Sequence, residues 1–158
     1  MHVRFAAHED VPALVRLRFD FFDDDPHMAV AGEKRAQIAA QLESYYRRHL
    51  NLDFFAAMAF TGGNEIAAVS FLVIHEKPAN YRFPTGRIGE ILNVFTYIEY
   101  RFNGYATAVL KALIDKAREE NASLVELRAT RSGKPVYEKL GFEETHDTNS
   151  TEMVLKLI

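Results

Sequence analysis

The sequence contains no cysteine among its 158 residues. This absence excludes disulfide bonds, a thiolate nucleophile and cysteine-based zinc sites at once. The six histidines, from His2 to His146, show no spacing typical of paired metal ligands. We therefore expect no metal in this protein.

Long apolar runs and an excess of charge of one sign are lacking as well. No stretch approaches the roughly 20 apolar residues of a membrane span, and the N-terminus has no signal-peptide pattern. The net charge is -3, and the basic residues are scattered rather than clustered. These features predict a cytoplasmic protein that binds neither nucleic acid nor membrane.

The composition that remains is that of an ordinary globular protein, with 48% apolar and 26% charged residues. The length favours one domain over residues 1–158. Hydrophobic periodicity and turn residues predict the mixed α+β order β-α-α-β-β-β-α-β-α-β-β. The expected strands cover residues 3–6, 54–61, 65–75, 89–96, 124–129, 142–144 and 152–157. The first expected helix begins after Asp10, its N-cap. The other expected helices cover residues 33–50, 104–121 and 135–140.

Residues 89–116 are the most informative stretch. An apolar strand expected to be covered on both faces ends at Thr96, and a short loop then leads through Gly104 into an amphipathic helix. The first N–H groups of a helix lack partners inside it, and the helix dipole adds partial positive charge there. Gly104 lets the backbone approach a ligand without a Cβ in the way. The pattern predicts an anion-binding site.

Two blocks of this sequence resemble the GNAT family of acyl-CoA-dependent N-acetyltransferases. The first is Arg101-x-x-Gly104-x-Ala106, which matches the family's Q/R-x-x-G-x-G/A loop between a strand and a helix. The second is Tyr137 followed by Gly141-Phe142, about 30 residues later. The family often has Asn where this chain has Thr130, and a proline where it has Ile98. The resemblance implies a mixed, mostly antiparallel sheet of six to seven strands flanked by about four helices.

The resemblance also implies a cofactor, acetyl-CoA, and roles for particular residues. The backbone of Val94, Phe95 and Thr96 would pair with the amides of the pantetheine arm like an added strand. Tyr137 would act as general acid toward the departing thiolate. The pyrophosphate would lie in the loop that begins at Arg101, on the backbone N–H groups of Phe102, Asn103, Gly104, Tyr105, Ala106 and Thr107.

Acetyl transfer to a primary amine also needs a base, because only about one alkylamine in 10³ is neutral at pH 7. Glu90 is the leading candidate, since a glutamate within an otherwise apolar strand is unusual. Asn93, a second polar residue of that strand, is expected to face the other side. His75 and Glu76, at the end of the neighbouring strand, are reserve candidates for the base.

Simpler interpretations stand beside these roles. Glu90 could pair with Arg87 or Lys77, and Tyr137 could be a core aromatic. The run Asp23-Asp24-Asp25 could be a solvated helix end or an acidic lip that attracts a cationic amine.

The whole chain is accordingly expected to be an N-acetyltransferase that acts on a small amine by direct attack in a ternary complex. A protein amine as acceptor and a non-catalytic acyl-CoA-binding or regulatory module remain alternatives. A dinucleotide-binding unit is disfavoured because the glycine fingerprint is incomplete. The strand pair expected at the end of the chain would offer an exposed edge for a homodimer.

Overall fold

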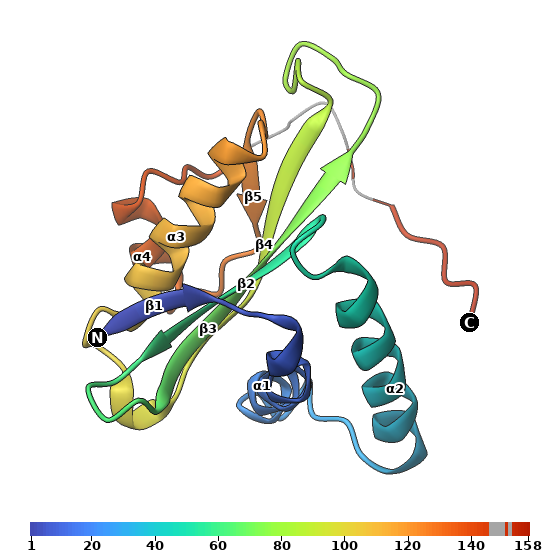
Figure 1. The fold of residues 1–158 in the computed structure, drawn as a ribbon. Coiled ribbons are helices and arrows are strands. Elements are labelled where there is room, and N and C mark those ends of the chain that lie inside the picture. Colours follow the sequence, from blue (N-terminus) through green and yellow to red (C-terminus); the bar gives the residue numbers. More distant parts are fainter. Residues whose placement is uncertain (146–150, 152) are drawn as a thin grey trace. The chain divides into compact units, whose positions relative to one another are not determined.

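The computed structural model describes residues 1–145, 151 and 153–158, which form two compact units, Met1–Arg128 and Ala129–Ile158. The first unit contains the sheet and three helices (Figure 1). Its strands are β1 (His2–Phe5), β2 (Phe54–Phe60), β3 (Ile66–Glu76), β4 (Arg87–Thr96) and β5 (Val125–Leu127). Its α-helices are α1 (Val11–Asp23), α2 (Gly32–His49) and α3 (Tyr105–Glu119).

The five strands lie in the order β1-β2-β3-β4-β5. The first four are antiparallel to their neighbours, whereas β5 runs parallel to β4. A parallel neighbour requires a crossover connection, and α3 supplies it between β4 and β5. The loop of residues 97–104 therefore leads from the end of β4 to the N-terminus of α3.

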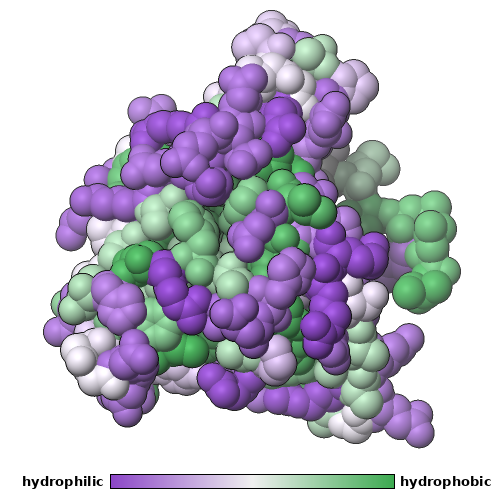
Figure 2. Space-filling model, in the orientation of Figure 1, coloured by the Kyte–Doolittle hydropathy of each residue, from purple (hydrophilic) through white to green (hydrophobic). Residues whose placement is uncertain are grey.

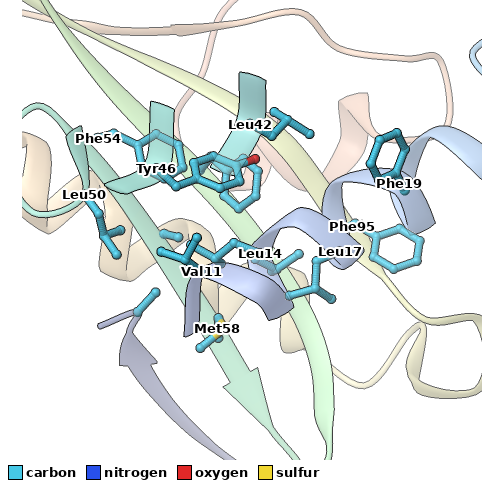
Figure 3. Packing of buried hydrophobic residues seen from close by; sticks show 14 of the residues in the cluster. Val11, Leu14, Leu17, Phe19, Leu42, Tyr46, Leu50, Phe54, Met58 and Phe95 are labelled. Carbon is cyan, nitrogen blue, oxygen red and sulfur yellow. The ribbon is translucent and has the colours of Figure 1, made fainter. Parts of the chain in front are cut away.

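Helices α1 and α2 pack on one face of the sheet. Leu14 and Leu17 of α1 are fully buried there against aromatic residues that include Tyr46 of α2 and Phe54 of β2 (Figure 3). The i, i+3 spacing of the two leucines places both on the same stripe of α1. Figure 3 shows these side chains meeting over the strands, so the core of this unit lies between the two helices and the sheet.

Helix α3 packs against β2, β3 and β4 through its own apolar stripe, with Val109, Leu110 and Leu113 fully buried. Its opposite side carries exposed charged residues such as Lys111 and Asp115. Strand β4 is therefore covered on both faces, as expected from its apolar sequence. In the view of Figure 2, polar side chains are interspersed with apolar ones over the surface.

The second unit contains the short helix α4 (Lys134–Lys139). Tyr137 is buried and makes an edge-to-face contact with Phe142, with ring centroids 6.1 Å apart. The turn after α4 passes through Gly141 at a φ of 92°, a conformation that glycine adopts without a Cβ penalty.

The α+β class, the mostly antiparallel sheet and the four α-helices are confirmed, with helix and strand ends within a few residues of the predicted ones. The sheet has five strands rather than six or seven. Residues 142–144 and the described residues of 153–157 have no strand structure, and Glu152 lies outside the described residues. Residues 153–157 are mostly apolar, but such short segments form strands only where they pair with neighbours, so their local pattern was a weak basis for strands. The edge proposed for a homodimer is thus absent from the described residues.

The predicted N-cap at Asp10 is wrong in its detail. The Asp10 carboxylate accepts no bond from the first turn of α1. It binds the Arg4 guanidinium at 2.6 and 2.9 Å and the Ala7 N–H at 2.8 Å instead. A charged partner on β1 outcompetes the local cap because hydrogen bonds between ionised groups are the stronger kind.

Candidate active site

The loop between β4 and α3 exposes a run of free backbone donors. Within the described part of the chain, the N–H groups from Phe102 to Thr107 donate to no protein acceptor, and the first helical bond there runs from Ala108 N–H to Gly104 C=O at 3.0 Å. Phe102 and Gly104 both have positive φ, 64° and 82°. Such alternation of backbone conformation turns successive N–H groups toward one concave side and suits an anion.

Side chains fix the shape of this loop. Asn103 Nδ2 donates to the carbonyls of Tyr100 at 3.2 Å and Arg101 at 2.9 Å, which closes the turn before Gly104. A Cβ at Gly104 would meet no atom within 4 Å. The glycine is therefore favoured by its left-handed conformation, not by crowding from the protein.

Arg101 braces the loop from behind. Its Nε donates to the Thr96 carbonyl at 3.1 Å, and one of its terminal nitrogens contacts both carboxylate oxygens of Asp24, the residue after α1, at 2.8 Å. One turn earlier on α1, Asp20 accepts a 2.5 Å hydrogen bond from the Tyr97 hydroxyl. Burial, followed by this hydrogen bond, raises the pKa of Tyr97 to about 12. Two contacts thus tie α1 to the end of β4.

The acidic run at the end of α1 is largely committed to such contacts. Asp23 pairs with Arg35 of α2 at 3.0 Å, and Asp25 accepts a hydrogen bond from His27 N–H at 2.9 Å. With Asp24 bound to Arg101, two of the three carboxylates are neutralised by arginine. These contacts support the structural interpretation of the run over an acidic lip.

One edge of β4 is open beside the loop. Strand β5 pairs with β4 only from Gly89 to Ile91, whereas β4 continues to Thr96. Tyr97 N–H donates to Ala67 C=O on the β3 side. Antiparallel alternation then directs the backbone of Phe95 toward β3 and that of Thr96 toward the open edge. Of the three residues predicted to pair with pantetheine, Thr96 faces the free side and Phe95 does not.

Glu90 lies half-exposed on β4 and contacts His75 of β3, with Oε2 2.8 Å from Nε2. Glu90 is opposite Val73 in the register, so His75 is its diagonal neighbour on the same face. Because an ionised carboxylate only accepts hydrogen bonds, His75 must present Nε2–H to it. The partners considered from the sequence are not the ones observed: Arg87 binds Glu120 at 3.1 Å instead.

Further polar groups surround this pair. Glu126 of β5 is exposed and lies opposite Glu90 in the parallel register. Tyr45 of α2 is near enough for the Glu90 charge to act on it. Burial, then the charge of Asp53, and to a smaller degree that of Glu90, raise the pKa of the Tyr45 hydroxyl.

The prediction that Asn93 faces the side of β4 opposite Glu90 is wrong, because its side chain binds Arg18 of α1, on the face where Glu90 lies near α2. The β3–β4 register advances two residues on β3 from Val69 to Phe71 but three on β4 from Leu92 to Phe95, which defines a bulge around Asn93. Asn93 has a φ of 55° and is buried, and its Oδ1 accepts a 3.1 Å hydrogen bond from Arg18 of α1. The bulge breaks the two-residue alternation on which the prediction rested.

Tyr137 belongs to the second unit, and burial raises the pKa of its hydroxyl. It therefore stays protonated at neutral pH, as a proton donor must. Thr130 holds the start of α4: its Oγ1 accepts from Gly133 N–H at 3.1 Å and its carbonyl from Lys134 N–H at 3.0 Å. The hydroxyl that replaces the family's Asn thus has a local partner.

Sequence reasoning missed Arg18, although a signal for it existed. Arg18 is four residues after Leu14 and three before Phe21, so it falls on the apolar stripe of α1. A charged residue on the buried side of a helix usually has a hydrogen-bonding or ionic partner, or a functional role.

Two absences can be stated for the described residues. No helix among them is long and apolar enough to cross a membrane. No three or more of their acidic and imidazole side chains are grouped so as to hold a metal ion.

Comparison with known proteins agrees with this geometry. The model of the Acetyltransferase (GNAT) family matches residues 12–142. A predicted acetyltransferase from Clostridium acetobutylicum, solved with acetyl-CoA, is 30% identical, with 97% of this chain and 95% of that chain covered and a TM-score of 0.81. A GCN5-related N-acetyltransferase from Ralstonia eutropha JMP134 is 20% identical, with 97% of each chain covered and a TM-score of 0.77, and shares the fold. Glucosamine-6-phosphate N-acetyltransferase from Arabidopsis thaliana is 18% identical, with 99% and 98% covered and a TM-score of 0.68.

Comparison with curated proteins gave no match. The family model and the Clostridium relative each cover most of the chain, which is sufficient to assign the family. The chain belongs to the GNAT family of acetyltransferases.

Proposed function

We propose that this protein transfers the acetyl group of acetyl-CoA to the primary amine of a small molecule by direct attack in a ternary complex. The observation that carries the proposal is the arrangement of β4. The free N–H groups of residues 102–107 follow its end, an open edge runs along Thr96, and Glu90 with its histidine partner lies nearer its start. Donor and acceptor sites are thereby aligned on one strand.

The cofactor would bind along this strand through the backbone. The pyrophosphate would accept hydrogen bonds from the free amides, and the helix dipole of α3 would favour its negative charge. The pantetheine amides would pair with the open edge at Thr96 and Val94. The 30% identical Clostridium protein, whose structure holds acetyl-CoA, supports this assignment. The Arg101 side chain, bound to Asp24, would hold the loop in shape and leave the phosphate contacts to the backbone.

Glu90 would remove a proton from the acceptor ammonium. Its Oε2 is bound by His75, and the other oxygen remains to accept that proton, directly or through a water molecule. His75 would fix the carboxylate orientation. The neutral amine then attacks the thioester carbonyl, the C–S bond breaks, and the thiolate leaves. Tyr137 would donate its phenolic proton to the thiolate.

No cysteine is present to accept the acetyl group, so a double-displacement route through a thioester enzyme has no nucleophile. We propose a cytoplasmic site of action on the basis of the sequence alone. A protein amine as acceptor and a non-catalytic acyl-CoA-binding role are the competing interpretations.

Thiol release from acetyl-CoA over a panel of small amines and lysine-containing peptides separates these possibilities. Turnover with small amines supports the proposal, and turnover with peptides alone contradicts the small-molecule acceptor. Saturable acetyl-CoA binding with no turnover on any amine would favour the non-catalytic module.

Replacement of Glu90 by Gln tests the base. We expect kcat/KM at pH 7 to fall about 10²- to 10⁴-fold. The deficit should narrow as the pH approaches the amine pKa, because more acceptor is then neutral without a base. The matched control is Glu43→Gln, an exposed glutamate paired with Arg47 on α2. Equal activity of Glu90→Gln and Glu43→Gln would remove Glu90 from the mechanism.

A further inference from the structure

The β4 bulge brings together two polar groups whose hydrogen-bonding capacity is not satisfied by the protein. Asn93 is 3% exposed, and its Nδ2 has no hydrogen-bond partner in the described structure. The orientation of this amide is fixed by chemistry, because the Arg18 guanidinium can only donate and must therefore meet Oδ1. A buried N–H₂ group is left without an acceptor, a costly arrangement unless something else supplies one.

Arg18 has the same deficit with a full charge. Of its N–H donors, one is used on Asn93, and no carboxylate of the described residues lies within ion-pair distance. Its guanidinium carbon lies 4.5 Å from the ring centroid of Phe22 and 5.7 Å from that of Phe21. These rings cover part of the cation and leave its hydrogen-bonding edge for another group. By contrast, Arg35 and Arg47 of α2 each bind a carboxylate, that of Asp23 and that of Glu43.

Both groups would bind the same kind of ligand, one that accepts hydrogen bonds. Arg18 offers a positive charge with several N–H donors, and Asn93 adds a neutral donor next to it. Arg18 is only partly exposed, and this burial lowers the pKa of its guanidinium. A partly desolvated cation gains most from an anion that arrives with its own hydrogen-bond acceptors.

We infer that Arg18 and Asn93 bind a carboxylate of the acceptor, so that the substrate is an amine that also carries a carboxylate. The inference deepens the proposed function and rests on it. Asn93 is three residues from Glu90 on β4, about 10 Å along an extended strand. The amine and the carboxylate of one small acceptor would then be held by the same strand that lines the cofactor site.

A carboxylate suits the site better than a phosphate does. One carboxylate neutralises the single guanidinium, whereas a phosphate monoester carries about -1.5 to -2 charges near neutral pH. The excess would lie beside the buried Asn93 and the phenylalanine rings, where no second cation is described. We therefore assign the carboxylate and treat an aminoalkyl phosphate as a competing outcome.

The test compares acceptors that differ only in the carboxylate, such as 5-aminopentanoate with butylamine and 6-aminohexanoate with pentylamine. For the wild type we expect kcat/KM to be at least 10-fold higher for the carboxylated member of at least one pair. In Arg18→Met this ratio should fall to about one. Arg47→Met, which removes an exposed arginine paired with Glu43, is the matched control and should keep the wild-type ratio.

Asn93→Asp is the more discriminating variant. Aspartate tolerates the left-handed conformation at this position and places a carboxylate beside Arg18 within the protein. It should therefore compete with the substrate carboxylate and bring the ratio to about one. If Arg18 were only a structural brace, the new ion pair would raise the melting temperature and leave the ratio unchanged, and the inference would be wrong.

A measurement without variants completes the test. Pentanoate, which has no amine, should inhibit wild-type turnover competitively against 5-aminopentanoate, and pentanol should not. Wild-type turnover with a ratio near one in every pair overturns this inference but leaves the proposed function intact. No turnover with any amine overturns the proposed function itself. Stronger Arg18-dependent turnover with 2-aminoethyl phosphate than with either carboxylated amine overturns the carboxylate assignment.

Discussion

Replacement of Gly104 by Ala separates cofactor binding from stability. Gly104 has a φ of 82°, where a residue with a Cβ costs about 1–2 kcal/mol. For a chain of this size each kcal/mol lowers Tm by roughly 2–4 °C. The added methyl group would contact no protein atom within 4 Å, so we expect no further loss of stability. It would, however, occupy the space in front of the free N–H groups of the loop, where the pyrophosphate is proposed to bind.

Gly32 provides a matched control. It opens α2 at a φ of 60°, and a Cβ there would also meet nothing within 4 Å. Gly32→Ala and Gly104→Ala should therefore lose about the same stability without ligand. Only Gly104→Ala should lose affinity for CoA, by at least tenfold, because only there does the methyl group lie where a ligand is expected.

Thermal unfolding at fixed CoA concentration measures the difference. At 100 times the wild-type Kd, CoA should stabilise the wild type and Gly32→Ala by about 2.7 kcal/mol. A tenfold weaker Kd leaves about 1.4 kcal/mol, so the CoA-induced rise in Tm should be about half as large in Gly104→Ala. An equal rise in both variants would refute the proposal that this loop holds the pyrophosphate. No rise in the wild type would refute cofactor binding as a whole.

Two further variants test the surroundings of the cofactor site. Asp24→Asn should weaken CoA binding several-fold, as measured by calorimetry, because it releases Arg101 from Asp24. Its Tm should change by less than about 4 °C, since the ion pair is exposed. The control Asp23→Asn, which releases Arg35 instead, should bind CoA normally. Tyr137→Phe should lower kcat about 10²-fold with little change in KM. Because burial raises the pKa of Tyr137, its protonated form persists above pH 10. The wild-type kcat should therefore show no alkaline fall below that pH. Such a fall, or full activity of the Phe variant, would argue against the acid role of Tyr137.

The fold was predictable because its signals are local. The β4–α3 unit has a continuous apolar strand, a glycine that tolerates positive φ and an amphipathic helix, and all three are visible within residues 89–116. The strand pair predicted after residue 141 had no such support, since short segments depend on neighbours that periodicity does not reveal. Glu90 could be singled out as a polar residue in an apolar strand. Its partner could not, because His75 precedes Glu90 by 15 residues and reaches it only through the register between β3 and β4.

The bulge in β4 explains why the acceptor side was the hardest part to predict. One extra residue opposite Ser70 places Asn93 in the left-handed region and turns its side chain toward Arg18. Without the bulge, strict alternation would put Asn93 on the α3 face, and Arg18 would lose its described hydrogen bond. The same insertion lies just beyond the last residue of β4 that pairs with β5, where the edge proposed for the cofactor begins. A single backbone irregularity therefore gives β4 both the Arg18 contact proposed to bind the acceptor and a position next to the open edge. Deletion of one residue at the bulge should disturb both sites together, whereas Asn93→Asp should affect the acceptor alone.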